Sequence, residues 1–385
     1  MMGIRTMTVI TVLLVLSAGR GRAQKFYFKD VSKLSGFTNA KGIHQDGNLA
    51  LCRDRSGNLW GIFGHTAKGE LKVWKGASAD RMHYRYDAAL NFKLGAAGLA
   101  FDNIPYPDGP KSRGQIWPLG LYIDSNDTFY CYIHNETGWY AGGTGYTINE
   151  QFEGEPDFRH IGLMTSIDHG HTWNFDGWII TAQEKSYSTR YLPDPQLKGG
   201  QEGPEYALGA GDCSLFENPN DEYLYLFYTK IYTKNGTFTD STCVARALKK
   251  SPGTWNKWYN GAWTQPANNG LESPIYGHQG YGPSVAWSRY LKKYIIVSSY
   301  RAGWDPKGKC SLQLSVCSDW ENQQWTPPEL LDACKGDTLI VPSVYLTITN
   351  TYTSGNIKVV GKTFSIFHNL WANDIKRVEV TTRKM

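Results

Sequence analysis

Two aspartates stand directly before apolar, strand-like segments of this 385-residue chain and could take part in acid–base chemistry. Asp46 lies in HQDGNLAL, and Asp212 lies in GAGDCSLF. Two carboxylates that face each other across a cleft are the minimum for hydrolysis of a glycosidic bond, because one protonates the leaving oxygen while the other activates water or attacks the sugar. The pair therefore predicts a hydrolytic site if the fold brings the two segments together.

A third acid, Glu136, lies with His134 in YIHNETGWY, at the end of another strand-like segment. We predict that Asp46, Asp212 and Glu136 are catalytic. Aromatic side chains near such acids can stack on sugar rings, and basic side chains can bind hydroxyl groups. The predicted substrate-binding residues are His134, His278, Arg301, Trp117 and Tyr281. The further candidates for the pocket are Glu202, Glu205, His44, His65, Arg246, Trp60, Tyr276 and Trp304.

One unit recurs along the chain: an apolar strand, a polar turn, and a second strand rich in aromatic or β-branched residues. A third strand-like segment follows several of these units, as in HIGLMTSID and CSLQLSVCS, which suggests four strands for each repeat. No long apolar stripe with a period of 3.6 residues is present, so little helix is expected. The five instances begin at Leu49, Pro118, Cys213, Ser284 and Ser343.

This pattern predicts an all-β fold, namely a five-bladed β-propeller with four-stranded antiparallel blades, whose radial arrangement leaves only short, protected strand edges. In a propeller the innermost strands begin around a central tunnel. Polar residues at those starts, such as Asp46 and Asp212, then converge from different blades on one mouth.

The segment SIDHGHTW at 166–173 falls between the third and fourth strands of the second unit and predicts a hairpin turn. Asp168 can accept backbone N–H groups, Gly170 can adopt a positive φ, and Trp173 can pack across the hairpin. The segment resembles the Asp-box of sialidases and other propellers, where its role is structural. We therefore expect Asp168 to stabilise the fold and not to catalyse.

Several longer segments carry a family resemblance: WPLGLYID, DFRHIGLMTSIDHGHTW, GAGDCSLFENPNDEYLYLFY and PGTWNKWYNGAW. The chain resembles the five-bladed propeller glycoside hydrolases of the arabinanase, β-xylosidase and furanosidase group, and more closely a set of secreted propeller proteins near that group. The resemblance covers nearly the whole mature chain. It implies a general base at Asp46 and a general acid at Asp212. The group's blade-two aspartate would fall near Leu119 and is missing, and Glu136 with His134 is the candidate substitute.

Three functions remain open. The leading one is a secreted glycoside hydrolase that acts on a polysaccharide or glycoconjugate. The missing blade-two acid favours a non-catalytic, lectin-like propeller that binds carbohydrate. A sialidase-like enzyme is the third, supported by the Asp-box segment, although the sequence lacks the repeated boxes and the Phe-Arg-Ile-Pro stretch typical of that family.

The N-terminal segment MMGIRTMTVITVLLVLSAGRGRAQ has a basic start, a short apolar run and small residues at Gly21 and Ala23. This pattern predicts a signal peptide at 1–23, a single domain at 24–385 and a secreted protein. The run is too short to span a bilayer, and no later segment approaches the roughly 20 apolar residues of a membrane helix.

Charge excludes some partners. Removal of the three leader arginines lowers the formal net charge from +5 to +2. We expect neither nucleic acid nor a membrane as partner, since neither is indicated by so small a charge. Carbohydrate is the predicted partner.

Glycosylation sequons begin at Asn126, Asn135 and Asn235. The seven cysteines form no C-x-x-C pair, so no zinc site is predicted. Some of them should form disulfides in an oxidising compartment. Related propellers can hold a calcium ion in the tunnel, but no ligand pattern here calls for one, and no cofactor is predicted. The candidate bridges are Cys213 with Cys243, or two of Cys310, Cys317 and Cys334.

Overall fold

The computed structural model of the chain is nearly all β. Its only described helix is the 3-10 helix η2 (Ala79–Arg81), so the expected β architecture with little helix is confirmed. Among the described residues no helix is long and apolar enough to cross a membrane. The predicted signal segment 1–23 lies outside those residues. They are 24–30, 45–66, 70–92, 114–136, 159–182, 206–234, 237–300, 311–330, 345–350, 354–369 and 375–384.

The first two groups of consecutive strands are antiparallel meanders. The first is β2 (Ala50–Arg53), β3 (Leu59–His65), β4 (Glu70–Gly76) and β5 (Met82–Asp87). The second is β7 (Gln115–Ile123), β8 (Phe129–Glu136), β9 (Arg159–Ser166) and β10 (Thr172–Ile180). The short strand β6 (Ala89–Leu90) runs parallel to β10 and so joins the two meanders.

Two further meanders follow the same order. The third is β11 (Tyr206–Glu217), β12 (Tyr223–Lys234), β13 (Thr237–Leu248), β14 (Trp255–Tyr259) and β15 (Ala262–Pro266). The fourth is β16 (Tyr281–Ser288), β17 (Lys293–Tyr300) and β18 (Ser311–Asp319), and β18 also pairs with β19 (Gln324–Trp325) and β20 (Glu329–Leu330).

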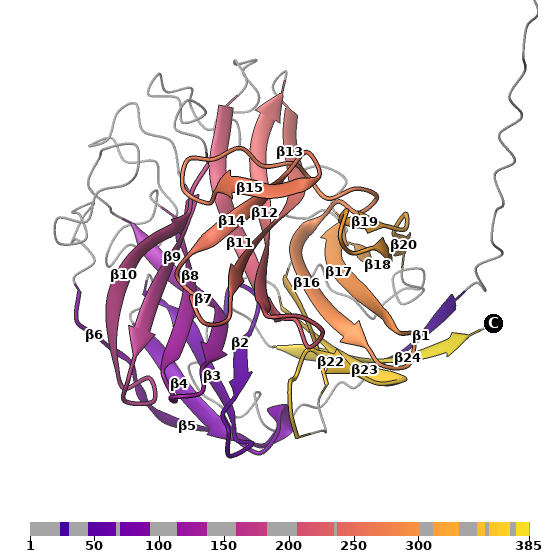
Figure 1. Cartoon of the computed structure of the whole chain (residues 1–385). Coiled ribbons are helices and arrows are strands. Elements are labelled where there is room, and N and C mark those ends of the chain that lie inside the picture. The colour runs from indigo at the N-terminus through magenta and orange to yellow at the C-terminus, as the bar shows by residue number, and fades with distance from the viewer. Residues whose placement is uncertain are drawn as a thin grey trace, which may run out of the picture.

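The last sheet joins the two ends of the described chain. Strands β21 (Tyr345–Thr349), β23 (Thr363–Asn369) and β24 (Lys376–Lys384) form a meander, and β1 (Gln24–Asp30) pairs antiparallel with β24. Figure 1 shows the indigo strand β1 beside the yellow strand β24. The remaining strand, β22 (Val359–Val360), pairs parallel with β16 and so connects the last sheet to the fourth meander.

The first strands of the five meanders pack against one another in a ring. Contacts join β2 to β7, β7 to β11, β11 to β16 and β16 to β21. The ring closes where the Leu49 N–H donates to Thr347 Oγ1 in β21 at 2.8 Å. Asn48 spans the ring, because its Nδ2 donates to Pro283 O at 2.9 Å and to Cys213 O at 3.4 Å. Every residue of β7 is buried, as expected for a strand covered on both faces.

The turn between β9 and β10 is held by Asp168. Its Oδ1 accepts the Thr172 N–H at 2.8 Å, and its Oδ2 accepts the Thr172 hydroxyl at 2.6 Å. Ser166 Oγ donates to Asp168 Oδ1 at 2.7 Å and accepts the N–H of Gly170, whose φ is 90°. The Trp173 indole N–H donates to Gly170 O at 2.8 Å. Each described hydrogen bond of the Asp168 carboxylate is therefore local to this turn.

The proposed bridge between Cys213 and Cys243 is wrong. Both are buried free thiols, as are Cys52, Cys131 and Cys317. Cys213 lies in β11 and Cys243 in β13, and β12 runs between them, so they are two strand spacings or about 9.5 Å apart. A disulfide requires Cα atoms within about 7 Å. Cys310 and Cys334 lie outside the described residues.

The three sequons differ in exposure. Asn126 is exposed on the turn between β7 and β8. Asn135 is fully buried, and its Nδ2 donates to Gln115 O at 3.0 Å, so the expectation of a glycan there is wrong. Asn235 lies outside the described residues.

Candidate functional site

Asp212 occupies an irregular position in β11. The register with β12 shifts between Gly211 and Ser214, and Asp212 has a φ of 45°. An L-residue other than glycine seldom adopts this left-handed conformation, and such positions often mark functional sites. The bulge interrupts the alternation of side chains between the two faces of the strand, and the Asp212 side chain at the bulge is buried.

Two strong donors hold the Asp212 carboxylate. The hydroxyl of Tyr281, at the start of β16, donates to Oδ2 at 2.6 Å, and Nη1 of Arg159, at the start of β9, donates to the same oxygen at 3.2 Å. Hydrogen bonds that involve a charged group are shorter and stronger than neutral ones. Because Oδ2 accepts from both donors, it is oriented as an acceptor and not as a proton donor.

A second acid, Glu136 at the end of β8, belongs to the same network. Arg159 Nη2 contacts Glu136 Oε1 at 3.2 Å, so one guanidinium bridges the carboxylates of Glu136 and Asp212. His134 Nδ1 accepts the backbone N–H of Asp212 at 3.1 Å, which leaves Nε2 to carry the proton. His134 Nε2 then donates to Glu136 Oε1 at 3.1 Å. The neutral Nε2–H form of His134 therefore fits this arrangement.

Asp46, just before β2, is the third acid of the cluster. Burial and the negative charges of Glu136 and Asp212 raise the pKa of Asp46 to about 7, although a hydrogen bond with Tyr345 opposes the rise. Asp46 Oδ1 is buried and has no hydrogen-bond partner in the described part of the chain. A substantial fraction of Asp46 is thus protonated at neutral pH, next to two acids that share a guanidinium.

Aromatic rings line the same region. The Trp117 ring in β7 stacks on His65, with centroids 5.3 Å apart, and tilts against His134 at 5.6 Å. The rings of Tyr281 and Tyr345 lie 5.8 Å apart. Trp117 is buried, so its ring packs against the imidazoles of His65 and His134 and is not exposed to solvent.

The structure brings six of the predicted catalytic and substrate-binding residues into one network of contacts and charge interactions, and one other, His278, stays apart from it. His278 is fully buried between Ser315 Oγ at 2.7 Å and Ser298 Oγ at 2.8 Å, and burial lowers its pKa to about 3. Arg301 lies outside the described residues, as do Glu202 and Glu205. The six residues are Asp46, Trp117, His134, Glu136, Asp212 and Tyr281.

Sequence reasoning missed two members, Arg159 and Tyr345. Arg159 stands in DFRHIGL, and a charged residue at the start of an apolar strand is a usable signal for a functional role. Tyr345 begins an otherwise ordinary apolar strand and gave no such signal. Within the described residues, no group of three or more His, Cys, Asp or Glu side chains is arranged to hold a metal ion.

No family model and no curated protein matches the chain. Among solved structures, an exo-β-1,3-galactanase from Phanerochaete chrysosporium with galactotriose matches over 91% of this chain and 64% of its own, at 11% identity and a TM-score of 0.49. A thermostable family-43 glycoside hydrolase matches over 90% and 91%, at 11% identity and a TM-score of 0.47. An endo-arabinase from Bacteroides thetaiotaomicron matches over 93% and 98%, at 11% identity and a TM-score of 0.43. At these values the likeness assigns neither a fold family nor a reaction to this chain.

Proposed function

We propose that the five meanders are the blades of a five-bladed β-propeller. The ring formed by the first strand of each meander supports this arrangement. The pairing of β1 with β24 supports it as well, because a strand from the start of the domain then completes the last blade and leaves no open seam.

We propose that the protein is a glycoside hydrolase with its active site at the starts of the inner strands. One observation carries the proposal: acids from three different meanders converge, two share the guanidinium of Arg159, and the third, Asp46, has a raised pKa. Glycoside hydrolysis needs such a division between a protonated and an ionised carboxyl group. A site of this kind pairs a proton donor with a fixed anion.

The roles follow from the surroundings of each acid. Asp46, with its raised pKa and an unpaired buried oxygen, suits the proton donor. Asp212, which accepts from Tyr281 and Arg159, suits the ionised partner that activates water or attacks the sugar. This assignment reverses the roles implied by the family resemblance. Glu136 takes the place of the missing acid near Leu119, since it holds Arg159 and His134 against Asp212.

The test is release of reducing sugar from a panel of plant, algal and animal glycans. Replacing Asp212 or Asp46 with asparagine should lower release by about 10²–10⁴-fold, because each change removes one of the two proton-transfer groups. The matched control is Glu321→Gln, an exposed acid on the turn before β19. Circular dichroism should show that all variants keep the β fold. Full activity in both aspartate variants would refute the assignment.

The alternative is a non-catalytic propeller that binds carbohydrate. The observation that favours it is the closed network of Asp212, Arg159, Glu136 and His134, in which each side chain already has a partner. Fully paired buried networks can serve rigidity alone. No release from any glycan, together with saturable glycan binding by the wild type and by Asp212→Asn, would establish this alternative.

We further propose that residues 1–23 are removed and that the protein is exported. The charge and apolar pattern of this segment supports the proposal, together with the start of β1 at Gln24. Mass spectrometry of the protein from culture medium should find an N-terminus close to Gln24. Retention of the intact leader in an intracellular product would contradict it.

A further inference from the structure

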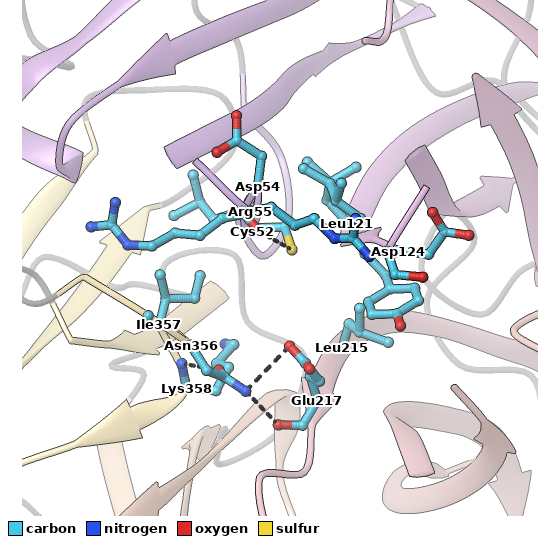
Figure 2. Close-up of a pocket in the computed structure, with 16 residues that line it drawn as sticks. Cys52, Asp54, Arg55, Leu121, Asp124, Leu215, Glu217, Asn356, Ile357 and Lys358 are labelled. Atoms are coloured by element: carbon cyan, nitrogen blue, oxygen red, sulfur yellow. Dashed lines mark hydrogen bonds between the residues drawn. The ribbon is translucent and has the colours of Figure 1, made fainter. Parts of the chain in front are cut away.

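A cavity of about 360 Å³ opens at the opposite ends of the inner strands. Figure 2 shows its lining residues, which come from the ends of β2, β7 and β11 and from the segment before β22. An apolar part of the wall and several charged side chains line the cavity, the apolar residues being Leu51, Leu121, Ile123, Leu215 and Ile357. This volume lies within the usual range for small-molecule sites.

The cavity is separate from the carboxylate cluster. Glu217, which lines the cavity, lies five residues beyond Asp212 in β11, which corresponds to about 16 Å along a strand. Arg53, at the end of β2, likewise lies at the opposite end of that strand from Asp46. A ligand in the cavity and a substrate at the cluster would therefore occupy opposite ends of the ring of inner strands.

Two acids of the cavity are committed to their own turns. Asp54 accepts Trp60 Nε1 at 2.8 Å, the Asn58 N–H at 2.8 Å and Asn58 Nδ2 at 2.9 Å. Asp124 Oδ1 accepts the N–H groups of Asn126 at 2.7 Å and Thr128 at 3.0 Å. These carboxylates stabilise the turns after β2 and β7 and have little capacity left for a ligand.

The third acid, Glu217, is also engaged. Asn356 Nδ2 donates to Glu217 Oε2 at 3.2 Å and to its backbone oxygen at 3.0 Å, as the dashed lines in Figure 2 mark. Lys249 Nζ lies 4.0 Å from the other carboxylate oxygen, Oε1. Burial raises the pKa of Glu217 above its ordinary value, although Lys249 opposes the rise. The Glu217 carboxylate is therefore already engaged by Asn356 and Lys249.

The cations of the cavity keep free donors. Arg55 is exposed, and its guanidinium makes no hydrogen bond or ion pair with the described residues. Arg53 uses Nη1 on two backbone oxygens, and its Nε is buried without a partner among those residues. Lys358 is buried, its Nζ donates to Ser284 Oγ at 3.1 Å and Ile348 O at 3.2 Å, and burial with no described carboxylate beside it lowers its pKa to about 7. The cavity is lined by as many positively as negatively charged residues. The charged groups that keep unused hydrogen-bonding capacity are the N–H donors of Arg53 and Arg55.

We propose that this cavity binds a sugar-sized ligand that carries an oxyanion, such as a uronate or a sulfated monosaccharide. An oxyanion supplies acceptors for the free N–H groups of Arg53 and Arg55, and its negative charge favours the protonated form of Lys358. The apolar wall offers a surface for the C–H face of a sugar ring. The site is distinct from the hydrolytic centre proposed above and does not depend on that reaction.

Calorimetric titration of the full-length protein with glucuronate tests the proposal, with glucose as the neutral counterpart and inorganic sulfate as competitor. Glucuronate should bind saturably, glucose should bind at least about tenfold more weakly, and sulfate should displace glucuronate. Arg55→Gln, an exposed position that does not threaten folding, should weaken glucuronate binding about tenfold. Lys358→Met should also weaken it.

Two controls separate this site from others. Arg289→Gln removes the same charge from an exposed position outside the cavity, and Asp212→Asn alters the carboxylate cluster. Both should leave glucuronate binding unchanged. Loss of binding in Asp212→Asn with retention in Arg55→Gln would place the ligand at the cluster and overturn the proposal. Equal binding of glucose and glucuronate, or no saturable binding of glucuronate, would also overturn it.

Discussion

Replacing Asp46 with asparagine keeps the size of the side chain and removes its ionisation. Burial, together with the charges of Glu136 and Asp212, raises the pKa of folded Asp46 to about 7, whereas an unfolded aspartate titrates at about 3.9. The folded state therefore binds this proton more tightly than the unfolded state does. The contribution of Asp46 to wild-type stability is greatest when Asp46 is protonated and falls as the pH rises from about 4 through about 7.

The size of this effect follows from the shift. A difference of about three pKa units corresponds to about 4 kcal/mol when each unit is worth about 1.4 kcal/mol. Asp46 is partly exposed, and solvent screening reduces the figure to about 2 kcal/mol. The asparagine side chain cannot ionise, so the Asp46→Asn variant should gain about 2 kcal/mol over the wild type between about pH 4 and about pH 8.

Urea denaturation of both proteins at the two pH values measures this gain. Effects from all other titrating groups cancel in the difference between variant and wild type, provided that their surroundings are unchanged. Glu321→Gln, an exposed acid, should show no comparable change with pH. If the difference in unfolding free energy between Asp46→Asn and wild type is the same at both pH values, the raised pKa of Asp46 is wrong, and with it the proton-donor role.

Three further predictions concern activity and stability. If Asp46 donates the proton, kcat/KM should fall as the pH rises through about 7; a rise through that range would instead assign it as the base. Asp168→Asn should lower the unfolding free energy by about 1–2 kcal/mol without changing kcat, because it weakens the bonds to Thr172 and Ser166. Burial alone would raise the pKa of Asp168, but those bonds lower it to about 2, so the wild-type advantage in urea denaturation should be present above about pH 4 and vanish as the pH falls through about 2. Lys257→Met should cost about 3 kcal/mol in the same assay, since it leaves the buried Glu272 with fewer partners; an unchanged urea midpoint would refute this.

The local pattern of the sequence was sufficient to predict the class of fold and the positions of the turns. Alternating apolar residues and polar turns specify strands, because the side chains of a strand point to opposite faces with a period of two. The Asp168 turn could be anticipated for the same reason: its hydrogen bonds run between residues at most four positions apart. The candidate acids also followed from local position, since each stands at the start or end of a strand.

Long-range pairing was decided only by the tertiary structure. The pattern of β1 does not indicate that its partner is β24, and the spacing of Cys213 and Cys243 does not indicate that β12 separates them. Asn135 matches a sequon but is buried at the end of a central strand. Periodicity shows which residues of a strand share a face. Periodicity carries no information on which other strand will pair with that strand.

The candidate site shows the same difference between what the local sequence indicates and what only the tertiary structure decides. The sequence supplied Asp46, Asp212 and Glu136, but only the fold placed Arg159 between two of these acids and raised the pKa of the third. A bulge with a positive φ at Asp212 cannot be inferred from GAGDCSLF, since it arises from pairing with β12. Residue types therefore determined which chemistry was available, and burial and neighbouring charge, which are properties of the assembled sheets, decided which acid holds a proton.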